Sequence, residues 1–312
     1  MHNRFVVPVI LVILVLTACG APAVPAVPTA LPTTPAPTVT PAPTWTPTPS
    51  PTPTPVPPAR LTIDWPASVS PLSPVPLAVS LMPPAGMSAN ATITATVMDP
   101  DARVYGTFAL TERRGVRYSA PEGLLLPFRP LPGYWWLIVH VESDLPIVGD
   151  PAVFFEPAPV LLRDLSGMLP PAITLQVPQA FAEAVSQGDV GAGGRVWTYG
   201  RGEVGLWWAP GPAEALTVSN ALVLLEATHA ADGRFEAPPA PSEAVPATIQ
   251  SAPAFEFPEV WPGSAGGPGR SWVIQGADHT LYVLRVRALG SDAIPALHAE
   301  VAETFGFVEP AE

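Results

Sequence analysis

Alternating apolar and polar residues mark the first half of the chain as rich in strands. From Thr92 to Val97 every second residue is apolar, which predicts a strand with Ile93, Ala95 and Val97 on its buried face. Asp99-Pro100-Asp101 follows, a sequence typical of a turn. We therefore expect the chain to return in a second strand, and Val104 to Thr111 fits that expectation.

The most apolar strand candidate runs from Tyr134 to Val141. Its predicted core-facing residues are Trp135, Leu137, Val139 and Val141. A further strand, Val153 to Phe155, ends the set. About seven short strands separated by turn residues within roughly a hundred residues predict an all-β sandwich. We place this first domain at residues 60–159.

The run Leu131-Pro132-Gly133-Tyr134, which enters the most apolar strand, resembles the late strand of immunoglobulin-like modules in bacterial surface proteins. The chain has neither the cysteine pair nor the tryptophan spacing of antibody domains. The resemblance therefore implies an immunoglobulin-like fold and no activity.

After Val160 the pattern mixes strands with helices. Arg195 to Tyr199 and Glu203 to Trp208, joined by Gly200-Arg201-Gly202, predict a hairpin with a glycine-rich turn. Three further strands are predicted at Phe255 to Trp261, Ser271 to Gly276 and Thr280 to Ala288. In the last of these, Tyr282, Leu284 and Val286 alternate toward one face.

Three segments of the second half have helical patterns. Gln179 to Ser186 predicts a short helix, and Thr217 to His229 a longer one. A closing helix is expected to begin at a cap formed by Ser291 or Asp292. Its predicted apolar stripe consists of Ile294, Leu297, Val301 and Phe305. The residues predicted to lie on the opposite, outer side are His298, Glu300 and Glu303.

A hairpin, helices and antiparallel strands predict an α+β domain over residues 160–312. The order of elements, ending in the strand Leu281-Tyr282-Val283-Leu284 and a last helix, resembles the PsbP-like class of small α/β/α sandwiches. That resemblance implies an antiparallel sheet with packed helices. It also implies, by analogy alone, a binding or assembly role.

The N-terminus carries an export signal. Phe5 to Leu16 is an apolar run too short to span a bilayer as a helix but suited to the central region of a signal peptide. Leu16-Thr17-Ala18-Cys19 follows and resembles the lipobox of bacterial lipoproteins. The resemblance implies cleavage after residue 18 and a diacylglyceryl group on Cys19. Two acyl chains give stable anchoring in a membrane, which would be the outer membrane in a diderm organism.

Proline and threonine dominate the chain after Cys19. Residues 20–59 contain no charged side chain, and proline at every second or third position prevents helix and sheet. Polyproline II is the default conformation of such a segment. We therefore expect residues 19–59 to be a disordered tether between the lipid and the folded domains.

Composition removes several kinds of chemistry. All 14 basic residues are arginine, so a P-loop, a Schiff base or a Ser-Lys dyad cannot be built. The only cysteine is Cys19, which excludes disulfides and a thiolate zinc site from the folded part. A net charge of −12 argues against nucleic acid as a partner.

Candidate site residues in the folded part are few. The histidines at 140, 229, 279 and 298 show no metal-ligand spacing, so we predict no metal, cofactor or catalytic residue. Trp207, Trp208 and Trp261 are the ligand candidates. Adjacent tryptophans on a strand face opposite sides, so one exposed ring would suit a sugar or an apolar ligand. The alternative is that helices cover both faces of the sheet.

Three functions follow from these patterns. The first is a non-enzymatic, membrane-anchored surface module that binds or assembles with an envelope protein or glycan. The second is a receptor for a small solute or a glycan that uses the tryptophans. The third is an envelope hydrolase that uses carboxylates or a Ser/His/Asp set.

Overall fold

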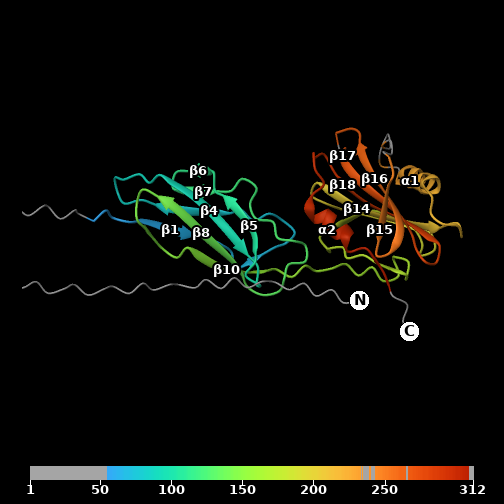
Figure 1. Ribbon diagram of the computed structural model, residues 1–312, viewed down its shortest axis with the longest axis horizontal. Coiled ribbons are helices and arrows are strands. Elements are labelled where there is room, and N and C mark those ends of the chain that lie inside the picture. Colours follow the sequence, from blue (N-terminus) through green and yellow to red (C-terminus); the bar gives the residue numbers. More distant parts are fainter. Residues whose placement is uncertain (1–54, 233, 235–238, 240–242, 265, 309–312) are drawn as a thin grey trace, which may run out of the picture. The chain divides into compact units, whose positions relative to one another are not determined.

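The computed structural model describes residues 55–232, 234, 239, 243–264 and 266–308. These residues form mostly β-sheet with two helices (Figure 1). Within them, neither helix is long and apolar enough to cross a membrane. The predicted signal peptide, Cys19 and most of the tether lie outside the described residues. The lipid anchor therefore stays a prediction.

Residues 59–157 form ten strands. They are β1 (Ala59–Ile63), β2 (Ser68–Val69), β3 (Ala78–Met82), β4 (Ala91–Met98), β5 (Val104–Ala109), β6 (Glu112–Arg114), β7 (Arg117–Ser119), β8 (Trp135–Ser143), β9 (Ile147–Val148) and β10 (Ala152–Pro157). The strands make two five-stranded sheets, ordered β6-β7-β3-β1-β9 and β2-β10-β8-β4-β5. The four predicted strands appear as β4, β5, β8 and β10. β2, β6, β7 and β9 are too short to show any alternation.

One hydrophobic cluster joins the two five-stranded sheets. It contains Leu61 and Leu81 from one sheet and Ile93 and Leu137 from the other. The predicted inner faces of β4 and β8 are buried, apart from the half-buried Val141. Trp135 is fully covered, and its indole N–H donates to the carbonyl of Leu131 at 3.0 Å. The run that enters β8 thus supplies the acceptor that a buried indole needs.

The second half contains an antiparallel seven-stranded sheet, ordered β12-β13-β14-β18-β17-β16-β15. Its strands are β12 (Ala182–Gly188), β13 (Gly193–Tyr199), β14 (Gly202–Pro210), β15 (Val245–Ile249), β16 (Ala252–Trp261), β17 (Gly267–Gln275) and β18 (Thr280–Ala288). β11 (Ile173–Thr174) and β19 (Gly306–Phe307) form a separate pair. Gly200 sits at φ 54° in the predicted β13–β14 turn, where glycine meets no steric penalty.

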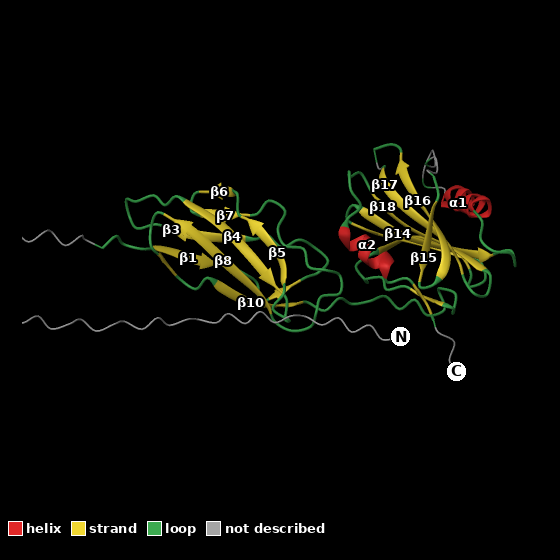
Figure 2. Ribbon diagram, in the orientation of Figure 1, coloured by secondary structure: helices red, strands yellow, loops and turns green. Residues whose placement is uncertain are grey.

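The two helices lie on opposite faces of the seven-stranded sheet, as Figure 2 shows. α1 (Val218–Asp232) begins at a reciprocal cap, because Thr217 and Asn220 each accept the other's backbone N–H. α2 (Ala296–Glu303) places Leu297, Val301 and the following Phe305 in one cluster with Tyr282, Leu284 and Val286 of β18. The predicted stripe and the predicted strand face therefore do meet.

The helix predicted at Gln179–Ser186 is wrong, since Ala182 to Ser186 belong to strand β12 (Ala182–Gly188). Its residues pair in register with β13, from Ala182 opposite Thr198 to Gly188 opposite Gly193. Helix propensity is a weak preference, and a full ladder of hydrogen bonds at the edge of a sheet outweighs it.

The start of the closing helix is also different from the prediction. α2 begins at Ala296 after Pro295, and neither Ser291 nor Asp292 caps it. The reason is local: a residue before proline disfavours helical geometry, so Ile294 cannot belong to the helix. His298 was predicted to face outward, yet it is only 2% exposed. Its ring packs against Phe181 and against the backbone at Gly202, where the absence of a side chain leaves room for it.

Candidate functional site

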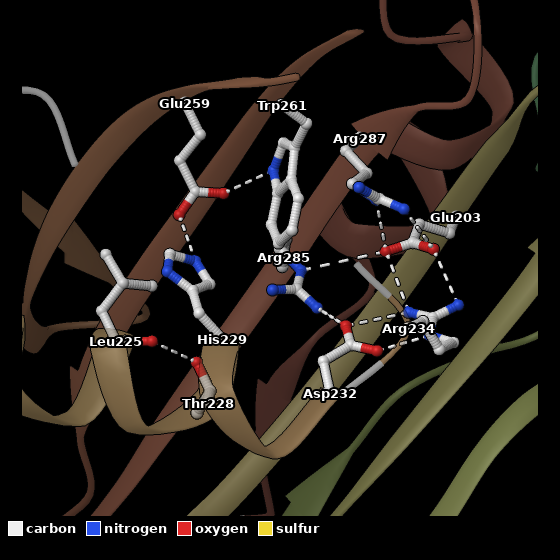
Figure 3. Close-up of polar contacts among 10 residues, drawn as sticks. All are labelled: Glu203, Leu225, Thr228, His229, Asp232, Arg234, Glu259, Trp261, Arg285 and Arg287. Carbon is white, nitrogen blue, oxygen red and sulfur yellow. Dashed lines mark hydrogen bonds and ion pairs between the residues drawn. The ribbon is translucent and has the colours of Figure 1, made fainter. Parts of the chain in front are cut away.

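The face of the seven-stranded sheet that α1 covers carries charge where a core is normally apolar. The register places Glu203 of β14 opposite Arg287 of β18. Gly269 of β17 then lies opposite Arg287, and Glu259 of β16 lies opposite Gly269. We call the connected set the α1-face network (Figure 3). It consists of Glu203, His229, Asp232, Arg234, Glu259, Trp261, Arg285 and Arg287.

Glu203 is the centre of the network. Its carboxylate lies 2.7 Å from Nε of Arg287, 3.1 Å from Nη1 of Arg234 and 3.9 Å from Nε of Arg285. Asp232, at the end of α1, accepts hydrogen bonds from Arg234 and from Arg285. Burial alone would raise the pKa of Asp232, but these two arginines outweigh it and hold the pKa below its usual value. The Asp232 carboxylate is thus held as an anion.

Glu259 connects the other end of the network to α1. One of its oxygens lies 2.9 Å from Nε2 of His229, and the other accepts the indole N–H of Trp261 at 3.0 Å. The His229 ring in turn stands edge-on to the Trp261 ring. Both side chains of the His229–Glu259 pair are almost wholly covered. A buried carboxylate at this position is tolerated because both of its oxygens are hydrogen-bonded.

Two tryptophans enclose Arg285, and glycines make room for their rings. A Cβ at Gly205 would stand 2.4 Å from the Trp207 ring, and one at Gly269 would stand 3.0 Å from Trp261 Nε1. The guanidinium of Arg285 lies 4.2 Å from the Trp207 ring centre and 4.8 Å from that of Trp261. These are cation–π distances, which help to offset the removal of a charge from water.

The three tryptophans predicted as ligand residues are buried. Trp207 and Trp208 do face opposite sides of β14, and Trp261 belongs to the α1-face network. Each is 2% or 3% exposed, because α1 covers one face of the sheet and α2 with its loops covers the other. Trp207 and Trp208 line a pocket of about 420 Å³ beside α1, but very little of either side chain is exposed.

The α1-face network is built to hold α1 against the sheet. Every carboxylate oxygen of Glu203, Asp232 and Glu259 already accepts from, or is paired with, an arginine, histidine or tryptophan. These contacts join α1 to β14, β16 and β18 and give the network a structural role.

The sequence contained a signal for this network that the patterns above did not use. Arg285 and Arg287 alternate with apolar residues inside β18, one of the most apolar strands of the chain. Arginine at two successive positions on one strand face is unusual in a buried strand unless carboxylates are close. Glu203 also stands on the same face of β14 as Trp207.

A cleft of about 1070 Å³ opens at the end of the same sheet, and we call it the turn cleft. It lies where the β15–β16 turn and the β17–β18 turn meet the β19 strand. Its apolar lining includes Ala252, Pro253 and Phe307, and its polar lining includes Gln250, Asp278 and His279. Phe307 is held edge-on by Tyr282 and by Phe305. The Gln250 side chain accepts the Phe307 N–H at 2.8 Å.

Both turns of the cleft are strained. Gln250, Ser251 and His279 adopt φ values of 47°, 70° and 64°, a region that residues with a Cβ seldom occupy. Each such residue costs about 1–3 kcal/mol and persists only where the surroundings impose it. A two-residue hairpin turn of type I′ needs positive φ at both of its residues, so the β15–β16 turn itself imposes this geometry on Gln250 and Ser251.

Ser251, His279 and Asp278 all line this cleft, but they do not form a catalytic triad. Both oxygens of Asp278 bind Thr280, one through its backbone N–H and one through its hydroxyl. A triad needs that carboxylate on the histidine and the histidine on the serine. Among the described residues no hydrogen bond links these three side chains. Within the part of the chain that the structure describes, no group of three or more histidine, cysteine or acidic residues could hold a metal ion.

Comparisons with known proteins add little. No protein-family model and no curated protein matches this chain. Among solved structures, the solution structure of cyanobacterial PsbP (CyanoP) from Synechocystis sp. PCC 6803 is similar, at 10% identity and a TM-score of 0.35. The match covers 48% of this chain and 95% of CyanoP. A PsbP-like neighbour is thus found, as the sequence predicted, but so low a TM-score supports no argument.

Proposed function

We propose that this chain is a lipid-anchored protein of the bacterial envelope that acts as a non-enzymatic binding or assembly module. In this proposal Cys19 carries the lipid and residues 20–59 are the tether. The first domain is an immunoglobulin-like spacer, and the second is a PsbP-like α+β domain that binds the ligand. The lipobox supports the anchor.

The observation that carries the binding role is the turn cleft. Its volume of about 1070 Å³ is slightly above the usual range of small-molecule sites, and its lining combines apolar residues with a few polar groups, as is typical of them. The strained residues Gln250, Ser251 and His279 belong to this cleft. Both carboxylate oxygens of Asp278 accept hydrogen bonds from Thr280, which favours a binding role over a catalytic one. A compact, largely apolar ligand with one hydrogen-bonding end fits this lining.

The binding role is tested with the dye bis-ANS, an apolar probe, on the full chain in non-ionic detergent below its micelle concentration. Ala277, in the β17–β18 turn, lines the cleft and is exposed, so Ala277→Trp fills the cleft without disturbing the core. Ala230→Trp, on the exposed side of α1, is the matched control. We expect saturable dye binding that Ala277→Trp lowers at least about tenfold and that the control leaves unchanged. Equal binding by all three proteins would refute the cleft as a site.

The anchor has a separate test. Mass spectrometry of the membrane fraction should find a diacylglyceryl group on Cys19 and an N-terminus at that residue. Cys19→Ser should abolish both, because a hydroxyl does not replace the thiol as the acceptor. An unmodified Cys19 in the mature wild-type protein would contradict the proposal.

A further inference from the structure

The outer face of the β2-β10-β8-β4-β5 sheet carries an apolar row that crosses four strands. The register aligns Phe154 of β10 with Trp136 of β8, Trp136 with Met98 of β4, and Met98 with Val104 of β5. Their strand neighbours Phe155, Trp135 and Val97 point into the core. The four side chains therefore stand together on the solvent side, and we call them the aromatic row.

The aromatic row is exposed to an unusual degree. Phe154 is 60% exposed, Val104 is 62% exposed and Trp136 is 42% exposed. The rings of Trp136 and Phe154 pack edge to face, with 5.4 Å between their centroids and an interplanar angle of 76°. Each ring restricts the orientation of the other, so a ligand would lose little free energy in immobilising these two side chains. Large aromatic residues in a connected, exposed group mark an interaction surface.

The surface beside the aromatic row is rich in hydroxyl groups. The next positions across β4 and β5 are Thr96 and Thr107, whose hydroxyl oxygens are 3.5 Å apart. Thr94 follows on the same side of β4. Charge lies close to the row on two strands: the exposed Glu156 follows Phe154 by two residues on the same side of β10, and the His140–Glu142 pair lies further along β8. An occupant of this face thus meets aromatic rings, methyl groups and hydroxyls, with the Glu156 carboxylate at the end of the row.

We propose that the aromatic row binds an extended, uncharged polysaccharide strand. The apolar faces of sugar rings stack on aromatic rings, and their hydroxyl groups exchange hydrogen bonds with threonine. Neighbouring strands are about 4.8 Å apart, so a row over four strands extends for about 14 Å, enough for several sugar units in line. This site lies on the first domain and does not depend on the turn cleft, so it goes beyond the proposed function.

Two other occupants fit less well. A bilayer surface would have to dehydrate the threonines beside the row, since a flat sheet face cannot insert the row alone. A second copy of the chain would need about 800 Å² of contact on each partner for a stable dimer, and a single row of four side chains is narrow for that. The hydroxyl groups and the narrow shape of the row therefore favour a sugar strand.

The experiment is isothermal titration of the full chain, in non-ionic detergent, with cellohexaose and chitohexaose. We expect at least one hexasaccharide to bind, and Trp136→Ala and Phe154→Ala each to lower the affinity by about tenfold or more. Thr107→Val, which keeps the shape but removes the hydroxyl, should weaken sugar binding as well. Met82→Ala and Val148→Ala, exposed apolar residues of the other sheet, are the controls and should change nothing. Thermal melting of each variant verifies that it is folded.

Three results would overturn the proposal. The first is that neither hexasaccharide binds. The second is binding that survives Trp136→Ala in a folded variant. The third is tighter association after Thr107→Val, either with phosphatidylcholine vesicles or between copies of the chain in ultracentrifugation, because an apolar partner gains from losing that hydroxyl. The turn cleft and its dye binding are untouched by all three.

Discussion

The two faces of the seven-stranded sheet are covered by one helix each, but they are held in different ways. Under α2, apolar side chains such as Leu297 and Val301 pack on Tyr282 and Leu284. Under the C-terminal half of α1, Asp232 and His229 meet buried arginines and carboxylates. An apolar face is stabilised by any well-packed neighbour, whereas a charged face is stable only when every partner is present. The difference should appear when single residues are removed.

The largest effect is expected at the centre of the α1-face network. Glu203→Ala leaves Arg285 and Arg287 buried without their shared carboxylate, and breaking such a pair typically costs about 3–5 kcal/mol. Urea unfolding of the variant measures this loss in the free energy of unfolding. Glu226→Ala, on the exposed side of α1, is the control and should stay within about 0.5 kcal/mol of wild type. A Glu203 variant as stable as the control would show that the network contributes nothing.

Truncation on the α2 face comes next. Leu297 is 5% exposed and packs in the cluster that joins α2 to β18, so Leu297→Ala should cost about 2–5 kcal/mol. Leu297→Met should restore most of that loss, because an apolar core accepts a side chain of similar volume. Thermal melting of Leu297→Ala and Leu297→Met measures this recovery. Glu203→Gln should recover little of the stability lost in Glu203→Ala, although glutamine has nearly the same shape as glutamate. If Leu297→Met is no better than alanine, the α2 face is as specific as the other.

The third prediction concerns the polar exception on the α2 face. Burial lowers the pKa of His298 to about 4, although the nearby backbone of Gly202 and Tyr199 and the charge of Glu203 oppose the shift. The unfolded chain has a pKa near 6.5, so it binds the proton first as the pH falls. This contribution to stability is therefore complete above about pH 6.5 and decreases toward pH 4, by about 3 kcal/mol in all.

Urea unfolding between pH 7 and pH 4 measures that loss. His298→Gln, which does not titrate, should remove this part of the pH dependence, whereas His140→Gln, at an exposed position, should retain it. A His298 variant whose stability follows the wild-type pH curve would mean that the buried ring is not responsible.

The same contrast explains which parts of the fold were predictable from the sequence. The periodic spacing of apolar residues located β4, β8, β18 and the stripe of α2, because residues that are buried on one face of a strand or helix recur at a fixed interval. It failed at β12, where pairing with β13 decides the conformation, and at His298, whose burial depends on the space left by Gly202. The turn cleft was invisible because Gln250 and His279 come together only through the turns of separate hairpins.

The α1-face network was missed for a related reason. Polar residues in a strand normally lie on a solvent-exposed face. Only the strand register, which the sequence pattern does not give, shows that Glu203 of β14 lies opposite Arg287 of the neighbouring strand β18. The tryptophans at 207, 208 and 261 illustrate the opposite error. Their size suggested ligand contact, but the helices on both faces of the sheet cover them.

The α1-face network also bears on when the seven-stranded sheet can fold. Its members come from β14, α1, β16 and β18, so Glu203 must wait for Arg287, more than eighty positions later in the chain. Contacts between residues so distant in sequence form slowly, since the intervening loop must be closed first. While the chain is synthesised from its N-terminus, Glu203 cannot pair with its buried arginines until β18 has been made. The seven-stranded sheet should therefore complete its structure late, after nearly the whole chain has been synthesised.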